Sequence, residues 1–499
     1  MKTRLYTLVT GLLMAACITS YGQEIIGTYE HNLDRTYSYN DLVTCSDGSV
    51  LSGIYCYNLE NGQCTGMHVC KVSGEGQLID SVTFPPAWEL LGIPRTPDVF
   101  VLPNFQLDEA TGDLSIKITL IDADLNVIAD TTTPLALGPD LIGFMEDALF
   151  ISPVGDLIVT YWTDNVYHLA RIGLDGTVKA TNTTTRLLPQ NLTYQHTPDS
   201  TLFYQKIGVF NAAPERFYKL GGYIPENVDD PWPSVSYLFD ADLNLTETVL
   251  YNYVDENHTC EMASMMDHLA PITRGAIKDS YLLAAQIRTS DDTYATSLIK
   301  FDKDHNAIAF TNLETPTRMG GNPICTEVID ENTIYHTYNL YPNSYYLPVV
   351  GLARLNRDMD VVWNIEFPMI PNSMSYGTTL KVLANGDIAV SVVSGNYSPY
   401  CKLYIYIIRD NDPTATPETV ASEKLFDIYP NPVNDRLSLR FDDGATPESV
   451  ELYSLAGSLV AKQCKSLETI DMSAMSTGVY LLCVTFEDGE KRFEKVVKQ

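Results

Sequence analysis

The chain has 499 residues and a formal net charge of −31, because 63 acidic side chains oppose 32 basic ones. Its length suffices for a large apolar core and at least two domains. A surface with this much negative charge repels nucleic acid and anionic lipid, so we expect no nucleic-acid partner. Such a charge is typical of a soluble secreted protein.

The first 22 residues have the pattern of a secretory signal peptide. Lys2 and Arg4 precede an apolar run over residues 5–18, and Ser20-Tyr21-Gly22 then supplies a cleavage site. Such a segment is removed on export, so residues 1–22 take no part in the fold. A lipoprotein signal around the cysteine of this run is the alternative. No other stretch is long and apolar enough to span a bilayer.

Nine cysteines remain after this cleavage, and four of them crowd one segment. Export permits disulfides, and we expect some within residues 45–70, although their pairing stays open. An odd number leaves at least one thiol free or in an intermolecular link. No Cys-x-x-Cys pair occurs, which disfavours a zinc site. The crowded cysteines are Cys45, Cys56, Cys64 and Cys70.

A recurring turn organises the region from residue 24 to residue 415. In each copy an apolar strand enters a short turn rich in Asp, Asn or Gly, and a second apolar strand leaves it. These residue types hydrogen-bond their own backbone and tolerate positive φ, which predicts tight hairpins. The copies are residues 72–78, 121–127, 172–178, 239–245, 301–307 and 355–361.

A second kind of turn precedes each copy, so that each unit comprises four strands joined by two hairpins. Four strands per unit at a period near fifty residues favour a β-propeller. This earlier turn occurs seven times, at Asp47-Gly48, Gly112-Asp113, Gly155-Asp156, Asp199-Ser200, Asp279-Ser280, Asp330-Glu331 and Asn385-Gly386-Asp387.

The seventh unit lacks its second hairpin. Residues 403–408 form its last apolar strand, and polar residues follow; residues 25–30 form an apolar strand without a partner at the start. We expect these two strands to pair, because pairing closes the ring and leaves no long exposed edge. The prediction is an all-β chain whose residues 23–410 form a seven-bladed β-propeller closed by the N-terminal strand. A stacked solenoid is the alternative.

Potential metal ligands form no recognisable motif. The Asp-rich turns lack the Gly and Glu positions of a calcium loop. The densest cluster contains His258, Asp267 and His268 within residues 251–271. We interpret this stretch as an irregular connection between blades, with a metal or catalytic loop as the alternative. Because the common zinc, serine-hydrolase and phosphate-loop motifs are also absent, we predict no metal site and no cofactor.

Aromatic residues occur in several predicted loops. Trp88 and Trp232 lie in proline-rich segments, where aromatic faces suit sugar or peptide recognition. Packing of blades and anchoring of loops is the simpler interpretation. The other aromatic residues in predicted loops are Tyr341, Tyr345, Tyr346, Tyr397 and Tyr400.

The last part of the chain follows a linker. Residues 411–423 are polar, contain two prolines and lack apolar periodicity, which indicates a connection between domains. Residues 424–499 alternate short apolar runs with glycine-marked turns. This pattern favours a small immunoglobulin-like β-sandwich.

Three short motifs mark this C-terminal region, and together they resemble the type A C-terminal sorting domain of the type IX secretion system of Bacteroidetes. An ordinary adhesive module is the alternative, which the combination of motifs disfavours. The motif residues are Tyr429, Pro430, Asn431 and Pro432 at the start, Gly478, Val479 and Tyr480 near the end, and Lys495 and Lys498 at the close.

The resemblance implies an export route and a partner. The protein is expected to cross the periplasm and then the outer membrane through the type IX secretion machinery, and to reach the cell surface or the medium. In the resembling family, the sorting domain is removed and the protein attached to a surface lipopolysaccharide around such a linker, so we expect cleavage near residues 411–423.

The function of the propeller is open between classes, because this fold hosts both enzymes and binding platforms. Our first hypothesis is a non-enzymatic protein that binds a glycan, peptide or protein through loops on one face. Its weak candidate ligand-binding residues are Trp88, Trp232, His258, Asp267 and His268. The alternative is a hydrolase or lyase with carboxylates at the channel mouth, and a structural surface-layer component is the third.

Overall fold

The computed structural model describes most of the chain beyond residue 22. The predicted signal peptide lies outside the described residues, and so does the predicted linker except for its first residue. The described residues are 23–32, 40–57, 64–94, 96, 98–108, 111, 113–135, 144–163, 166–185, 203–212, 215–222, 234–251, 258–261, 268–272, 280–289, 293–313, 322–340, 349–367, 374–395, 402–411, 426–441, 446–454, 459–464, 467–486 and 491–499.

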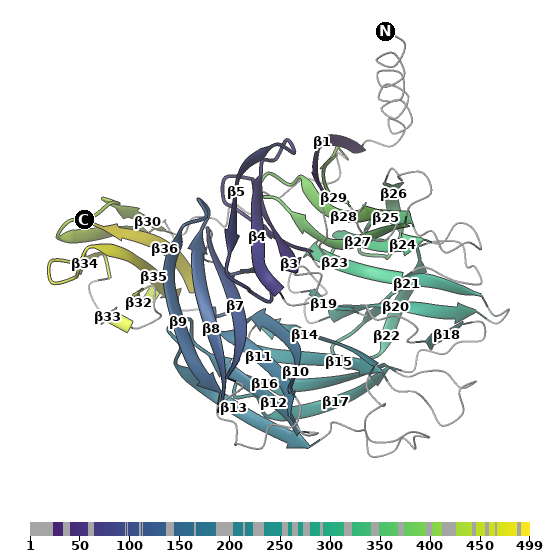
Figure 1. The fold of residues 1–499 in the computed structure, drawn as a ribbon, viewed down its shortest axis with the longest axis horizontal. Helices are drawn as coiled ribbons and strands as arrows, with labels where there is room; N and C mark the ends of the chain where they lie inside the picture. The colour runs from purple at the N-terminus through teal and green to yellow at the C-terminus, as the bar shows by residue number, and fades with distance from the viewer. Residues whose placement is uncertain are drawn as a thin grey trace, which may run out of the picture.

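The described residues are all-β (Figure 1). Nowhere in them is there a helix with the length and hydropathy needed to cross a bilayer. Those between 23 and 411 form seven antiparallel sheets, and sheets 1 to 4 take their strands in chain order. Sheet 1 contains β2 (Asn40–Thr44), β3 (Val50–Tyr57), β4 (Cys64–Val72) and β5 (Leu78–Phe84); sheet 2 contains β6 (Leu91–Gly92), β7 (Val99–Asp108), β8 (Asp113–Asp122) and β9 (Val127–Leu135); sheet 3 contains β10 (Phe144–Ile151), β11 (Leu157–Thr163), β12 (Val166–Ile172) and β13 (Val178–Thr185); sheet 4 contains β14 (Phe203–Ala212), β15 (Glu215–Gly222), β16 (Ser234–Asp240) and β17 (Leu245–Tyr251).

The next three sheets follow the same plan with two variations. In sheet 5, two short strands pair with different parts of β20, and in sheet 7 the outer strand is the first strand of the chain. Sheet 5 contains β18 (His258–Glu261), β19 (His268–Ile272), β20 (Ser280–Thr289), β21 (Tyr294–Phe301) and β22 (Ala307–Asn312); sheet 6 contains β23 (Asn322–Asp330), β24 (Thr333–Leu340), β25 (Val349–Leu355) and β26 (Val361–Glu366); sheet 7 contains β27 (Met374–Val382), β28 (Ile388–Gly395), β29 (Lys402–Asp410) and β1 (Gln23–Asn32).

The sheets follow one another around a closed, propeller-like arrangement. The inner strands β2, β6, β10, β14, β19, β23 and β27 contact one another in that order, and β27 in turn contacts β2. A stack of sheets in a line would not bring the last inner strand back to the first. Apolar clusters lie between neighbouring sheets; one of them joins Leu383 and Leu403 of the sheet 7 region to Val50 of sheet 1.

The predicted pairing of the two chain ends is observed. β1 pairs antiparallel with β29, with Ile25 opposite Ile408 and Glu30 opposite Tyr404. An ion pair between Glu30 and Lys402 lies in the same ladder. The N-terminal strand therefore supplies the outer edge of the last sheet.

Two glycines allow this strand to approach sheet 1. A Cβ added at Gly27 would lie 2.3 Å from the carbonyl carbon and oxygen of Glu75, and one added at Gly76 would lie 2.4 Å from the amide nitrogen of Thr28. Gly76 also has a positive φ of 76°. Only glycine lets the two backbones come this close.

The six predicted hairpins join the third and fourth strands of sheets 1 to 6. In sheet 2, Asp122 caps the turn: its Oδ1 accepts hydrogen bonds from the backbone N–H of Asp124 at 3.0 Å and of Asn126 at 2.9 Å. Asp240 and Asp302 repeat this pattern in sheets 4 and 5. The side-chain oxygens of these residues therefore serve the turn itself.

The expectation that Asp, Asn or Gly would take positive φ in these turns is wrong for four of them. The positive φ falls on the fifth residue of each turn, and Leu125, Leu243 and Met359 there are at most 4% exposed. Leu243 packs in the cluster that joins its own sheet to Ile158 of sheet 3. Burial of a leucine contributes about 1.5–3 kcal/mol, which offsets the roughly 1–2 kcal/mol cost of a left-handed backbone. The residues are Gly76, Leu125, Gly176, Leu243, His305 and Met359.

We predict an unusual order of stability at Leu243. Leu243→Ala should lower the free energy of unfolding by about 2–4 kcal/mol, because it leaves a cavity between two sheets. Leu243→Gly removes one more carbon but relieves the positive φ of 65°. The glycine variant should therefore be at least as stable as the alanine variant in urea unfolding. A glycine variant less stable than the alanine one by about 1 kcal/mol, the usual glycine penalty, would contradict the argument.

One of the seven earlier turns is not the first hairpin of its sheet. Gly112-Asp113 leads into β8, so it belongs to the connection between the second and third strands of sheet 2. Asp199-Ser200 lies outside the described residues. Turn-forming residues occur at both ends of the sheets, so they do not by themselves identify the first hairpin of a unit.

The described residues between 426 and 499 form a C-terminal module of two antiparallel sheets around one apolar core. The three-stranded sheet has the order β30-β31-β34 and the four-stranded sheet the order β33-β32-β35-β36. The strands are β30 (Phe426–Tyr429), β31 (Arg436–Phe441), β32 (Pro447–Ser454), β33 (Leu459–Gln463), β34 (Thr469–Asp471), β35 (Gly478–Phe486) and β36 (Lys491–Lys498).

Candidate functional site

The three C-terminal motifs, far apart in the sequence, meet at one edge of the C-terminal module. Asn431 Oδ1 accepts a hydrogen bond of 2.8 Å from the backbone N–H of Val497. Val433, just after the opening motif, donates its N–H to Val497 O at 2.7 Å and accepts one from Gln499 at 2.9 Å. The opening motif therefore holds the last strand in place.

The middle motif pairs with the same strand. Gly478 lies opposite Lys498, Val479 opposite Val497, and Tyr480 opposite Val496. The Tyr480 hydroxyl also donates to Ser476 O at 2.8 Å. Lys495 lies opposite Leu481 in the same ladder. Tyr429 is 53% exposed, so the motif presents an aromatic side chain to solvent.

Comparison with known families agrees with this geometry. Residues 427–499 match the family model described as the secretion system C-terminal sorting domain. The C-terminal module is a type IX C-terminal sorting domain. Its presence implies interaction with the type IX secretion machinery and export to the cell surface or the extracellular space. The comparison with curated proteins returns no match.

Solved structures resemble the arrangement of the central sheets only distantly. The β-propeller domain of the Trilobed protease from Pyrococcus furiosus has 8% identity and a TM-score of 0.41, covering 78% of this chain and 99% of its own. A subtype N10 neuraminidase-like protein of A/little yellow-shouldered bat/Guatemala/060/2010 has 11% identity and a TM-score of 0.32, with 78% of this chain and 100% of its own covered. The WD40 domain of SCAP from fission yeast has 8% identity and a TM-score of 0.33, with 76% and 98% covered.

The central sheets have two different ends. In a four-stranded meander, the connections from first to second strand and from third to fourth strand lie at one end, which we call the turn end. The connections from second to third strand and onward to the next sheet lie at the other, which we call the loop end. The six hairpins that join third and fourth strands therefore all lie at the turn end.

A cavity of about 520 Å³ opens at the turn end between β27, β2 and β6. Among its lining residues, only Cys45 and Lys381 carry titratable side chains. Burial is the main cause that raises the pKa of the Cys45 thiol to about 11, so it is uncharged at neutral pH. The lining residues are Val43, Thr44, Cys45, Ser46, Gly92, Ile93, Pro94, Thr96, Phe100, Lys381, Val382, Leu383 and Ala384.

Lys381 is already paired. Its ammonium contacts Glu327 of β23. Burial by itself would lower the pKa of Lys381, but the negative charge of Glu327 raises it above the usual range, so the lysine is charged at neutral pH. An ionised lysine and a protonated thiol supply neither a nucleophile nor a general base.

Two buried carboxylates of the turn end are likewise engaged with cations. Asp156 Oδ2 contacts Arg171 Nε at 2.7 Å, and its Oδ1 contacts Lys179 Nζ at 2.5 Å. Asp387 accepts two hydrogen bonds of 3.0 Å from Arg409. These pairs tie hairpins to neighbouring strands, and such engagement does not favour the hydrolase or lyase hypothesis.

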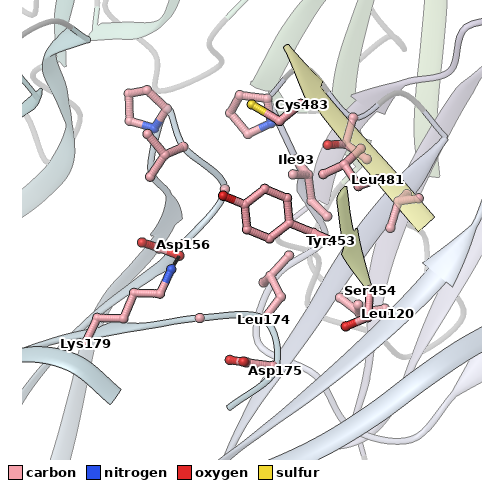
Figure 2. Close-up of a pocket in the computed structure, with 17 residues that line it drawn as sticks. Ile93, Leu120, Asp156, Leu174, Asp175, Lys179, Tyr453, Ser454, Leu481 and Cys483 are labelled. Atoms are coloured by element: carbon pink, nitrogen blue, oxygen red, sulfur yellow. Dashed lines mark hydrogen bonds and ion pairs between the residues drawn. The ribbon is translucent and has the colours of Figure 1, made fainter. Parts of the chain in front are cut away.

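A second, smaller pocket of about 230 Å³ lies where the sorting domain meets the turn end of sheets 2 and 3. Figure 2 shows Tyr453 of β32 extending into it, with Leu174 and Ile93 nearby and the Asp156–Lys179 pair on the opposite side from Cys483. Ile93 also lines the larger cavity. The sorting domain thus lies against the turn end.

The five candidate ligand-binding residues are not brought together where the structure describes them. Trp88 lies between sheets 1 and 2; it is 38% exposed and packs edge-on against Phe105, with ring centroids 6.3 Å apart. His258 and His268 belong to β18 and β19, so the expected irregular connection over residues 251–271 in fact contains two strands of sheet 5. Trp232 and Asp267 lie outside the described residues.

The expected disulfides within the first repeat are not formed. Cys45, Cys56, Cys64 and Cys70 are all free thiols. Cys45 and Cys70 belong to different apolar clusters on either side of sheet 1, which separates their side chains.

Proposed function

We propose that the chain is an exported protein of Bacteroidetes whose central region binds an extracellular ligand at the loop end. The seven sheets are the blades of a seven-bladed β-propeller over residues 23–410, and the sorting domain is an immunoglobulin-like sandwich over residues 424–499. Residues 1–22 are a signal peptide. Residues 411–423 are the linker near which the sorting domain is removed and the protein attached to a surface lipopolysaccharide.

One observation carries the ligand-binding proposal: the strand ends that flank the aromatic-rich segments lie at the loop end. β15 ends and β16 begins there, on either side of Trp232. The same holds for the strand ends that flank Trp88, residues 341–348 and residues 396–401. Aromatic residues grouped at one face supply apolar contact area beside polar groups, which suits a glycan, a peptide or a protein surface.

The position of the sorting domain also supports ligand binding at the loop end. Because this domain lies against the turn end, ligand binding at the loop end is compatible with its presence and with its removal. The hydrolase or lyase alternative has no comparable support, since Asp156 and Asp387 at the turn end are paired with cations.

A binding screen tests this proposal. The protein without its signal peptide, residues 23–499, should bind ligands on glycan or peptide arrays. Trp88→Ala or Trp232→Ala should weaken the strongest of these interactions about thirtyfold, as for a typical aromatic hot spot of about 2 kcal/mol. Ile308→Ala, at an apolar side chain of β22 that is 52% exposed, should leave the affinity unchanged. Equal affinity in all variants would place the ligand elsewhere.

A further inference from the structure

Closure of the ring brings one histidine of the N-terminal strand beside two residues of sheet 1. Potential ligand atoms of His31 on β1 and of His68 and Cys70 on β4 all lie within 4.8 Å of one another. The two histidines are partly buried, and Cys70 is fully buried. The ring centroids of His31 and His68 are 5.4 Å apart. His31 therefore comes from the last sheet of the ring, and His68 and Cys70 come from the first.

Hydroxyl groups hold both imidazoles. Nδ1 of His31 lies 3.1 Å from the Tyr29 hydroxyl, and Nδ1 of His68 lies 2.9 Å from Thr83 Oγ1. The Tyr29 hydroxyl also contacts Cys70 Sγ at 3.6 Å. Metal-binding histidines commonly have one ring nitrogen oriented by an oxygen in this way, while the other nitrogen binds the ion.

Burial disfavours charge on all three side chains of the cluster. Burial lowers the pKa of both histidines, and for His31 the neighbouring charge of His68 lowers it further, so both rings are neutral at neutral pH. Burial also raises the pKa of the Cys70 thiol. A bound ion would displace the thiol proton to solvent, so its affinity should increase with pH.

We propose that His31, His68 and Cys70 form a binding site for a transition-metal ion of the Zn²⁺ class. Two imidazole nitrogens and one thiolate are ligands that Zn²⁺ accepts, with water or a further group in the fourth position, whereas Ca²⁺ and Mg²⁺ require oxygen ligands. The bound ion links the N-terminal strand to sheet 1, so it stabilises the closed ring.

The sequence contains no zinc motif because the ligands come from two strands that are not neighbours in the chain. His68 and Cys70 are two residues apart on one strand and so share a face, which the chain alone indicates. His31 joins them only because β1 pairs with β29, the last strand of the ring, and thereby lies against sheet 1.

Metal titration tests the site. The protein titrated is residues 23–499, with its thiols reduced and any metal removed beforehand. We expect one equivalent of Zn²⁺ to bind with micromolar or tighter affinity, and the melting temperature to rise by about 3–5 °C at saturation. Co²⁺ in place of Zn²⁺ should give the charge-transfer absorption of a thiolate ligand. Binding should strengthen as the pH is raised from about 6 to about 8, with release of a proton.

Matched variants separate this site from others. His31→Gln and Cys70→Ser should weaken Zn²⁺ binding at least tenfold and abolish the thiolate band. His168→Gln, at a partly buried histidine of sheet 3, and Cys464→Ser, at an exposed cysteine of the sorting domain, should bind like the parent. Absence of the thiolate band in the parent protein overturns the proposal without any variant, and so does unchanged affinity in His31→Gln.

Discussion

Gly27→Ala is expected to destabilise the closed ring by about 3 kcal/mol or more, a large effect for one added methyl group. The added Cβ would lie 2.3 Å from the backbone of Glu75 and 2.7 Å from the amide nitrogen of Gly76. Backbone atoms cannot move aside as a flexible side chain can, so β1 would have to leave its position. β29 would then become an open edge, and Leu403 and Ile405 would lose part of their cover.

Urea unfolding and limited proteolysis after residue 22 measure this effect. Gly92→Ala is the matched control, because a Cβ there meets Val43 at an ordinary 3.7 Å. It should change the free energy of unfolding by no more than about 0.5 kcal/mol. Equal stability of the two variants would mean that closure by the N-terminal strand contributes little.

The second large effect concerns export. A chain that ends before residue 427 should fold its central sheets but fail to reach the cell surface, because the sorting domain is what the type IX machinery recognises. Cell fractionation with antibody detection should show nearly all of this shortened protein inside the outer membrane. Surface levels equal to those of the full chain would contradict the assignment of the export route.

The side-chain oxygen of Asn431 should contribute to the stability of the sorting domain. Asn431→Ala removes the acceptor of the Val497 N–H and should destabilise the domain by about 1–2 kcal/mol. Surface levels should fall with the folded fraction of the domain. Asn434→Ala, at an exposed position three residues further on, is the matched control and should export normally.

Local pattern predicted a large part of the fold. The hairpins at residues 121–127 and 239–245 follow from Asp and Asn side chains that bond backbone only two to four residues away. The pairing of residues 25–30 with residues 403–408 could be predicted as well, since one strand lacked a partner at each end of the chain. The sorting motif was recognisable because three short segments occur together in a fixed order.

Other features depended on neighbours that the sequence does not reveal. Leu243 takes a positive φ because its side chain is buried against sheet 3, and no rule on turn residues includes that burial. The stretch with His258 and His268 looked irregular, yet β20 is long enough to pair with both short strands. The reason in each case is that tertiary packing contributes more free energy than local preference.

The amino-acid sequence by itself therefore determined the strands, most of their hairpins, the complementarity of the two chain ends and the sorting motif, because these depend on residues near one another or on matching unpaired strands. Only the tertiary structure decided which distant side chains meet. His31 lies beside His68 and Cys70, and Asn431 beside Val497, because register and ring closure bring together strands that the chain order separates.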